Sequence, residues 1–262
     1  MTANNKLRPI SRRIEALSHI NSSALHHLER LIGRTNDFSR GSLFSEVGSV
    51  QSRPQVIVEG WMQRTHLLQD GRQQVLGHLL PGDFVNFSLH PQVPSLTNVE
   101  CVTDVVLADA SELRDHIAAV GPDDPLASAV LLALGVDEAI TMNCIVRLTR
   151  QSAYERLAHL FLDLHYRLSL AGFVEDNSFE LPLTQQALGE ALGLSVVHLN
   201  RVLMQLRRDG SIERTGRTIT LNDPERLRRR VDHNIPRWRI PAPFPAACGT
   251  VPARSSAIFA TV

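Results

Sequence analysis

The chain has 262 residues, enough for about two domains that each bury a core. Its formal net charge is zero, so any attraction to a charged partner has to come from a local surplus. The three cysteines are odd in number, far apart and without metal-ligand spacing, which excludes a disulfide framework and favours a reducing compartment; they are Cys101, Cys144 and Cys248.

The N-terminus, MTANNKLRPISRR, lacks the apolar segment of a secretory signal. The longest strongly apolar run, 129–133, is too short to span a bilayer. We therefore expect a soluble cytoplasmic protein.

The first 121 residues are expected to form one domain. An amphipathic helical stretch is predicted around 14–31, and from Val56 the hydrophobic period changes to two. Short strands then alternate with turn signals at Glu59-Gly60, Asp70-Gly71 and Pro81-Gly82. This pattern predicts an antiparallel β-roll with strands at 56–58, 61–68, 74–80, 98–102 and 105–108.

A long helix is predicted for the segment 122–150. Asp124 supplies a cap and Pro125 the first helical position, and the apolar pattern continues to about Thr149. The apolar face of this helix is wider than one neighbouring domain would normally cover, so a second copy of the helix is expected to cover it. The predicted dimer residues on this face are Val130, Ala133, Ile140 and Cys144. The alternative is a helix that packs wholly within its own chain.

Residues 151–224 are expected to form a second domain. Ser152 and Glu155 make a capping box that opens a helix to about Ala171. The stretch 183–208 then has two helices separated by Gly193, with Thr184 and Ser195 as their caps. Two short strands around Thr215-Gly216 follow, so the whole segment is typical of a winged helix-turn-helix.

This winged segment predicts DNA binding, because such folds place the first turns of their second helix in the major groove. The predicted base-reading residues are Val196, Val197, His198, Asn200 and Arg201. The predicted phosphate contacts are Thr184, Gln185, Ser195 and Arg217. Nine arginines against four acidic residues between 195 and 230 give a basic surplus of five, which favours DNA over a plain helical hairpin.

The segment 225–262 is predicted to be a disordered or loosely docked tail, since it is rich in proline and arginine and has no period. Either it adds nonspecific affinity for DNA or it is an inert extension.

The chain resembles the Crp/Fnr family of bacterial transcription regulators over roughly residues 10–222. The likeness lies in VIVEGWMQRTHLLQDGRQQVLGHLLPGDF within the roll and ALGLSVVHLNRVLMQLRRDGSI within the second domain. The resemblance implies an α+β fold with a cyclic-nucleotide-binding-like jelly roll, a long dimerisation helix and a C-terminal winged helix-turn-helix. It further implies a homodimer on a near-palindromic operator, with the roll acting as a sensor that biases the geometry of the DNA-binding helices through the long helix. RNA polymerase is an implied partner if the protein activates transcription.

Several departures from the family predict that its usual signals are not used here. Asn86-Phe87 stands where cyclic AMP-binding members carry Gly-Glu, and no Arg or Lys occurs between Gln73 and Leu113 to neutralise a cyclic phosphate. The iron-sulfur members of the family use four cysteines, most of them near the N-terminus, whereas no cysteine precedes Cys101 in this chain. Haem ligation is not expected either, although candidate ligands exist in His66, His78, His90 and Cys101. No cofactor or metal is therefore predicted.

The second helix departs from the family as well. Many members carry Glu three residues into this helix, where this chain has Val197, but Arg201 matches the family's arginine. Val196 and Val197 are suited to contact thymine methyl groups. Arg201 is thus the principal predicted reader of a base.

Two further function classes compete with DNA binding. One is a ligand-binding or protein-interaction module in which the helix-turn-helix contacts a protein partner; unlike DNA binding, a largely apolar contact would not weaken steeply with salt. The other is an enzyme, which is not expected because the chain lacks a P-loop, a G-x-S-x-G motif and an HExxH motif.

Overall fold

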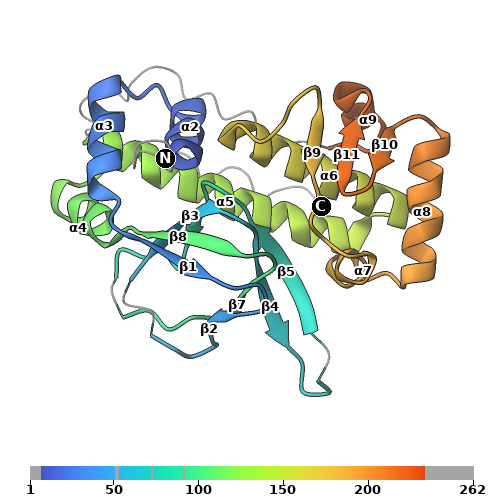
Figure 1. Cartoon of the computed structure of the whole chain (residues 1–262), viewed down its shortest axis with the longest axis horizontal. Coiled ribbons are helices and arrows are strands. Elements are labelled where there is room, and N and C mark those ends of the chain that lie inside the picture. The colour runs from blue at the N-terminus through green and yellow to red at the C-terminus, as the bar shows by residue number, and fades with distance from the viewer. Residues whose placement is uncertain (1–6, 51–52, 72, 91, 234–262) are drawn as a thin grey trace, which may run out of the picture.

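The computed structural model describes residues 7–50, 53–71, 73–90 and 92–233. Three parts follow one another along the chain, as predicted: an antiparallel β-roll, a long helix, and a helical domain with a small sheet. Figure 1 shows the long helix running between the roll on one side and the N-terminal helices on the other.

Two helices precede the roll where one amphipathic stretch was expected. They are α2 (Arg8–Leu17) and α3 (Ser22–Leu31). The chain is extended at Ser18, and the side chain of Asn21 caps α3 by accepting a hydrogen bond from the amide of Ala24. The cap begins a new helix and so divides the predicted segment in two.

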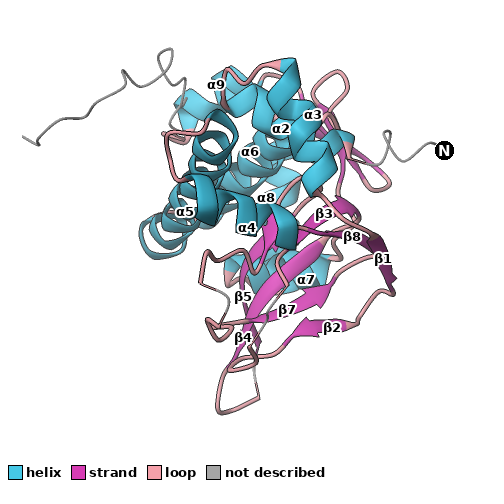
Figure 2. Cartoon of the chain, turned by 90° about the vertical axis from the view of Figure 1, so that its left-hand side faces the viewer, coloured by secondary structure: helices cyan, strands magenta, loops and turns pink. Residues whose placement is uncertain are grey.

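The roll consists of two four-stranded antiparallel sheets (Figure 2). One has the order β1 (Thr35–Phe38), β8 (Val105–Asp109), β3 (Gln55–Glu59), β6 (Phe84–Val85). The other has the order β2 (Leu43–Ser45), β7 (Asn98–Cys101), β4 (Met62–Leu67), β5 (Gln73–Leu79). A core of buried apolar side chains includes Ile57, Met62, Val99 and Leu107. The short strands β1, β2 and β6 were not predicted.

A short helix, α4 (Ser111–Val120), joins the roll to α5 (Pro125–Arg150). Asp124 caps α5 and Pro125 opens it, as predicted. By length and composition α5 is apolar enough to cross a membrane, so the short run 129–133 was too narrow a test. Within the fold, α5 contacts α2, α3, α4, α6 and β5.

Three of the four α5 residues predicted for the dimer interface are already covered by their own chain. Val130, Ala133 and Cys144 are buried within their own chain, and Ile140 is half-buried. The helix instead exposes Met142, Ile145 and Val146. Helix periodicity identified an apolar helix but not which side its own domain covers, because apolar residues lie around most of it.

The C-terminal domain begins with α6 (Ala153–Ala171), whose capping box of Ser152 and Glu155 is confirmed. It continues through β9 (Ser178–Glu180), α7 (Gln185–Leu192), α8 (Val196–Arg208), β10 (Ile212–Thr215) and β11 (Thr218–Leu221). The tail does not start at 225 as expected: Pro224–Arg230 forms α9, and Leu227, Val231 and His233 are buried. The rest of the predicted tail, 234–262, lies outside the described residues.

The C-terminal domain packs against the roll of the same chain. Trp61 and Leu80 belong to the same apolar cluster as α6 and α8, and α7 contacts β5. Beside this contact Arg167 of α6 pairs with Asp83 and donates to the carbonyl oxygen of His78 at 2.9 Å. Arg13 of α2 pairs with Asp83 at 3.0 Å and also with Asp137 of α5. This buried ionic cluster of Arg13, Asp83, Asp137 and Arg167 joins α2, α5, α6 and the roll.

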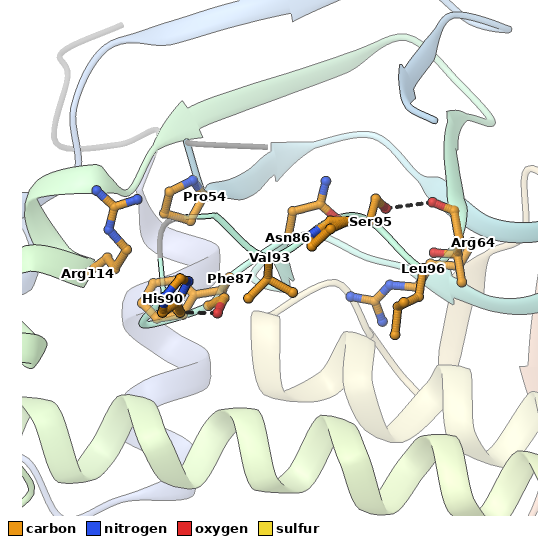
Figure 3. A pocket seen from close by; sticks show the side chains of 12 residues that line it. Pro54, Arg64, Asn86, Phe87, His90, Val93, Ser95, Leu96 and Arg114 are labelled. Atoms are coloured by element: carbon orange, nitrogen blue, oxygen red, sulfur yellow. Dashed lines mark hydrogen bonds between the residues drawn. The ribbon is translucent and has the colours of Figure 1, made fainter. Parts of the chain in front are cut away.

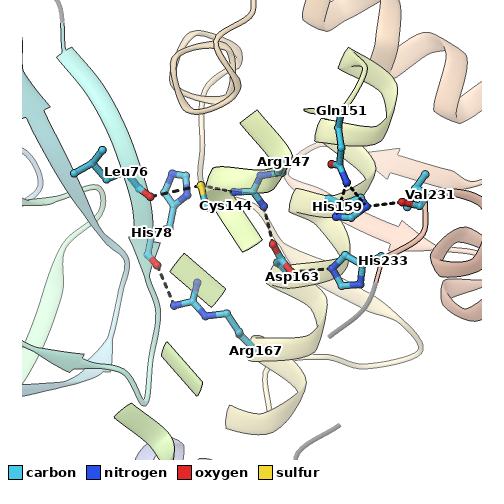
Figure 4. Close-up of polar contacts among 10 residues, drawn as sticks. All are labelled: Leu76, His78, Cys144, Arg147, Gln151, His159, Asp163, Arg167, Val231 and His233. Carbon is cyan, nitrogen blue, oxygen red and sulfur yellow. Dashed lines mark hydrogen bonds and ion pairs between the residues drawn. The ribbon is translucent and has the colours of Figure 1, made fainter. Parts of the chain in front are cut away.

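A second polar chain links α5 to α6 and the end of α9 (Figure 4). Arg147 donates to the sulfur of Cys144 at 3.0 Å and to Asp163 at 2.6 Å, and Asp163 also accepts from His233 at 2.8 Å. Burial by itself raises the pKa of Asp163, but the His233 hydrogen bond and the charge of Arg147 lower that pKa below its usual value.

Candidate nucleic-acid interface

The turn between α7 and α8 is tight, and its backbone approaches the end of α7 closely, as in a helix-turn-helix. Gly193 ends α7 in the left-handed conformation, with φ of 64°, and the amide of Leu194 bonds back to the carbonyl of Gly189 at 2.9 Å. A Cβ at Gly189 would lie 2.6 Å from the carbonyl oxygen of Leu194, so this position requires glycine. The predicted caps are confirmed: Thr184 accepts from Ala187 and Ser195 from His198.

Helix α8 turns one apolar face inward and leaves the other free. Leu199, Val202, Leu203 and Leu206 are buried, whereas Val197 is 72% exposed and Arg201 is exposed. Met204 and Arg208 continue the outward face at helical spacing and are also exposed. An uncovered face of this kind can enter a major groove without rearrangement of its own domain.

The remaining predicted DNA contacts surround this face. Val196 and His198 are exposed in the first turn of α8, and Thr184 and Ser195 are exposed at the caps. Arg217 is exposed just after the tight turn of the wing. Asn200 is half-buried, and its amide donates to the side-chain oxygen of Gln185 at 3.0 Å. This contact connects a predicted base reader on α8 with a predicted phosphate contact on α7.

The arginines of this domain divide into two groups. Arg228 pairs with Glu225 at 2.6 Å, and Arg230 pairs with Asp209 at 2.8 Å and lies 4.9 Å from the ring centre of Tyr154. Within the described part of the chain no ion pair involves the exposed arginines of α8 and the wing: Arg201, Arg207, Arg208 and Arg217. The positive charge available to a phosphate backbone therefore lies on α8 and the wing, and on α9 at the exposed Arg226 and Arg229.

The structure adds residues that the sequence interpretation omitted. A groove of about 540 Å³ lies between the end of α8 and the first wing strand, and its lining includes Met204, Arg207, Arg208 and Arg214. The helical spacing of Met204 and Arg208 from Val197 could have placed these two residues on the outward face. The sequence could not have shown that Arg207 lies near Arg214, because that proximity depends on how the wing folds back on α8.

The roll contains a second candidate site, a cavity of about 270 Å³ (Figure 3). Asn86 and Phe87 line it together with Arg64 of β4 and Arg114 of α4, which lie at opposite ends of it. The lack of Arg and Lys between Gln73 and Leu113 therefore does not leave the cavity without a cation, because the fold supplies two arginines from outside that segment. The sequence spacing could not show this.

The candidate haem ligands named from the sequence lie in different environments. His78 and Cys101 are buried, His66 is exposed on β4, and His90 lines the roll cavity. Over the described residues, no three His, Cys, Asp or Glu side chains form a group suited to hold a metal.

Comparisons with known proteins agree with this architecture. Residues 155–230 match the family model of the Crp-like helix-turn-helix domain. The anaerobic regulatory protein of Pasteurella multocida is 26% identical over 78% of this chain and 74% of its own length. The fumarate and nitrate reduction regulatory protein of Escherichia coli is 23% identical over 82% of this chain and 85% of its own.

Among solved structures, FixK2 from Bradyrhizobium japonicum superimposes with a TM-score of 0.64 at 22% identity. The match covers 75% of this chain and 96% of that protein. It shows that the two proteins share a fold over most of this chain.

Proposed function

We propose that this chain is a transcription regulator of the Crp/Fnr type that binds a near-palindromic DNA operator as a homodimer. The observation that supports this most directly is the outward face of α8, with exposed Val197 and Arg201 beside unpaired arginines on α8 and the wing. The face supplies contacts to base edges, and the flanking arginines supply contacts to phosphates. The first amides of α8, at the positive end of the helix dipole, add a site for a phosphate oxygen.

The apolar stripe that α5 leaves uncovered supports the proposed homodimer. Met142, Ile145 and Val146 are each more than half exposed, at 52%, 54% and 53%, and Leu131 and Leu134 extend the same side at half burial. Packing this stripe against a second α5 removes apolar surface from water and pairs the two α8 helices. Two α8 helices related by a twofold axis require two half-sites arranged as an inverted repeat.

Selection of bound sites from random DNA with the purified protein tests this function. We expect enrichment of a site with twofold symmetry and an affinity that falls steeply as salt rises, because each phosphate contact releases counterions. Failure to enrich a symmetric site would contradict the proposal. Capture of a protein partner with an affinity insensitive to salt would instead favour an interaction module.

We also propose that the roll does not respond to a cyclic nucleotide. No carboxylate lines its cavity within the described residues, so none is present to hold a ribose hydroxyl, and Phe87 occupies the position of the family's glutamate. Calorimetry with cyclic AMP and cyclic GMP is expected to show no saturable heat. Micromolar affinity for either nucleotide would refute this part of the proposal.

As a regulator of transcription the protein acts in the cytoplasm, without catalysis, and it contacts RNA polymerase if it is an activator. Transcription in vitro from a promoter that carries the selected operator separates the two modes. An activator raises the transcript yield of the purified polymerase, whereas a repressor lowers it.

A further inference from the structure

The roll cavity presents hydrogen-bond donors that have nothing to bind. Among the described residues the guanidinium of Arg64 has no hydrogen bond or ion pair, although the side chain is half-buried. The side-chain nitrogen of Asn86 is buried and has no partner there either. A buried donor without an acceptor costs free energy. The charges of Asp137 and Asp83 act on Arg64, but neither carboxylate forms an ion pair with it, so its guanidinium still lacks a bonded acceptor. Both groups line the same cavity (Figure 3).

The backbone around these donors is arranged in an unusual way. Arg64 lies opposite Gly77 on β5 at a register irregularity, and opposite residues of antiparallel strands point to the same face. Since Gly77 has no side chain, the room beside the arginine stays open; a Cβ there would meet no atom within 4 Å. Asn86 has a φ of 52°, a left-handed conformation that is costly for a residue with a side chain.

The rest of the lining limits the chemistry of an occupant. Arg114 adds a second guanidinium, which also bonds to Asp115. Phe87, Val93 and Leu96 provide apolar surface between the two arginines, and no acidic side chain lines the cavity within the described residues. Its volume of about 270 Å³ is just below the range of roughly 300–1,000 Å³ that is usual for small-molecule sites.

We infer that this cavity binds a compact organic anion, a carboxylate with an apolar body, through Arg64 and the amide of Asn86. The carboxylate accepts from both donors, as arginine-carboxylate pairs do, and the apolar body lies against Phe87, Val93 and Leu96. The inference rests on the proposed function in one respect, because it takes the roll as the part of this transcription regulator that binds a signal. It adds the chemical class of the signal.

Binding to the full-length protein is measured by calorimetry with two probe pairs, benzoate against benzamide and hexanoate against hexanamide. Each amide matches its acid in size but lacks the charge. We expect saturable binding of at least one acid and a much weaker response to its amide. Equal binding of acid and amide, or no binding of either acid, would overturn the inference.

Variants locate the site. Arg64→Met keeps a long apolar side chain and is expected to weaken acid binding about tenfold or more, because it removes a charge-assisted hydrogen bond. Arg40→Met, at an exposed arginine of the roll outside the cavity, is the matched control and should bind as the parent does. An Arg64→Met protein that binds the acid normally would contradict the inference.

Asn86→Gly provides a second variant in case Arg64→Met folds poorly. Glycine adopts the positive φ at this position without strain, so the fold is retained while the amide is lost. Binding of the acid is expected to weaken severalfold, and unchanged affinity would remove Asn86 from the site.

Two further measurements are included. One distinguishes an organic carboxylate from a simple inorganic anion, and the other distinguishes failure of this inference from failure of the proposed DNA-binding function. Inorganic phosphate that binds as well as the acids would show a simple anion site and overturn the carboxylate assignment. Selection of DNA sites is run on the same preparation: a symmetric site without acid binding removes only the ligand class, whereas acid binding without any enriched site removes only the DNA-binding function.

Discussion

Arg201 is the residue on which specific recognition of DNA is expected to depend most. Its side chain is exposed one turn after Val197, and no ion pair holds it within the described structure. We predict that Arg201→Ala weakens binding to the selected operator by about 1–3 kcal/mol, the value of one bidentate contact to a base. Fluorescence anisotropy on the selected and a scrambled site measures this difference.

Two comparisons make the Arg201 result specific. Arg217→Ala is expected to weaken binding to both sites alike and to reduce the salt slope by about one, as a phosphate contact does. Arg40→Ala, at an exposed arginine of the roll, should change neither. An equal loss on both sites for Arg201→Ala would assign that residue to phosphate as well.

His78 makes stability depend on pH. Burial, and then the charges of Arg167 and Arg147, lower its pKa to about 3. Between pH 6.5 and 3 the unfolded chain binds a proton at this residue that the folded chain does not, so the stability falls as the pH falls through this range. From pH 7 to 5.5 His78 should account for a loss of about 1 kcal/mol in the free energy of unfolding.

Urea unfolding at the two pH values tests the His78 prediction. His78→Gln should show a smaller loss than the parent, although His159 and His165, whose pKa values burial also lowers, keep part of the dependence. His66→Gln, on the exposed end of β4, is the control. The same loss in His78→Gln as in the parent would show that His78 does not carry it.

At the scale of elements, the ionic cluster of Arg13, Asp83, Asp137 and Arg167 joins helices to the roll. Asp83 is 3% exposed and pairs with both arginines, so its removal leaves buried positive charge uncompensated. We predict that Asp83→Asn lowers the free energy of unfolding by about 3–5 kcal/mol. Asp115→Asn, which removes the exposed carboxylate that pairs with Arg114, should cost less than about 1 kcal/mol. Similar losses in chemical denaturation would contradict a structural role for the cluster.

The elements themselves were largely predictable from local chemistry. Caps and periodicity act over a few residues, so predictions that rest on them were confirmed. They are the long helix, the capping box at Ser152 and the helices of the helix-turn-helix. The break at Asn21 and the helix Pro224–Arg230 were missed. In α9 the burial of Leu227 stabilises a segment whose composition alone suggested a tail.

At the scale of the whole molecule, the uncovered stripe of α5 is the proposed dimer interface. We predict that Ile145→Asp shifts the protein from dimer to monomer, since it places a charge within the stripe where apolar surface would be buried. Sedimentation equilibrium measures the shift. Val120→Asp, at a similarly exposed apolar residue of α4, should leave the dimer intact. A monomeric parent protein, or an Ile145→Asp dimer of parental affinity, would contradict this interface.

The sequence by itself determined the order of the parts and the local geometry of the reader, because caps, turns and periodicity depend on neighbouring residues. Tertiary structure alone decided which side of α5 stays open, and it brought Arg64 and Arg114 to one cavity beside Asn86. It also placed Arg147 against Asp163 and Arg167 against Asp83. These contacts join residues of separate helices and strands, and such distances are set by packing, which no spacing along the chain records.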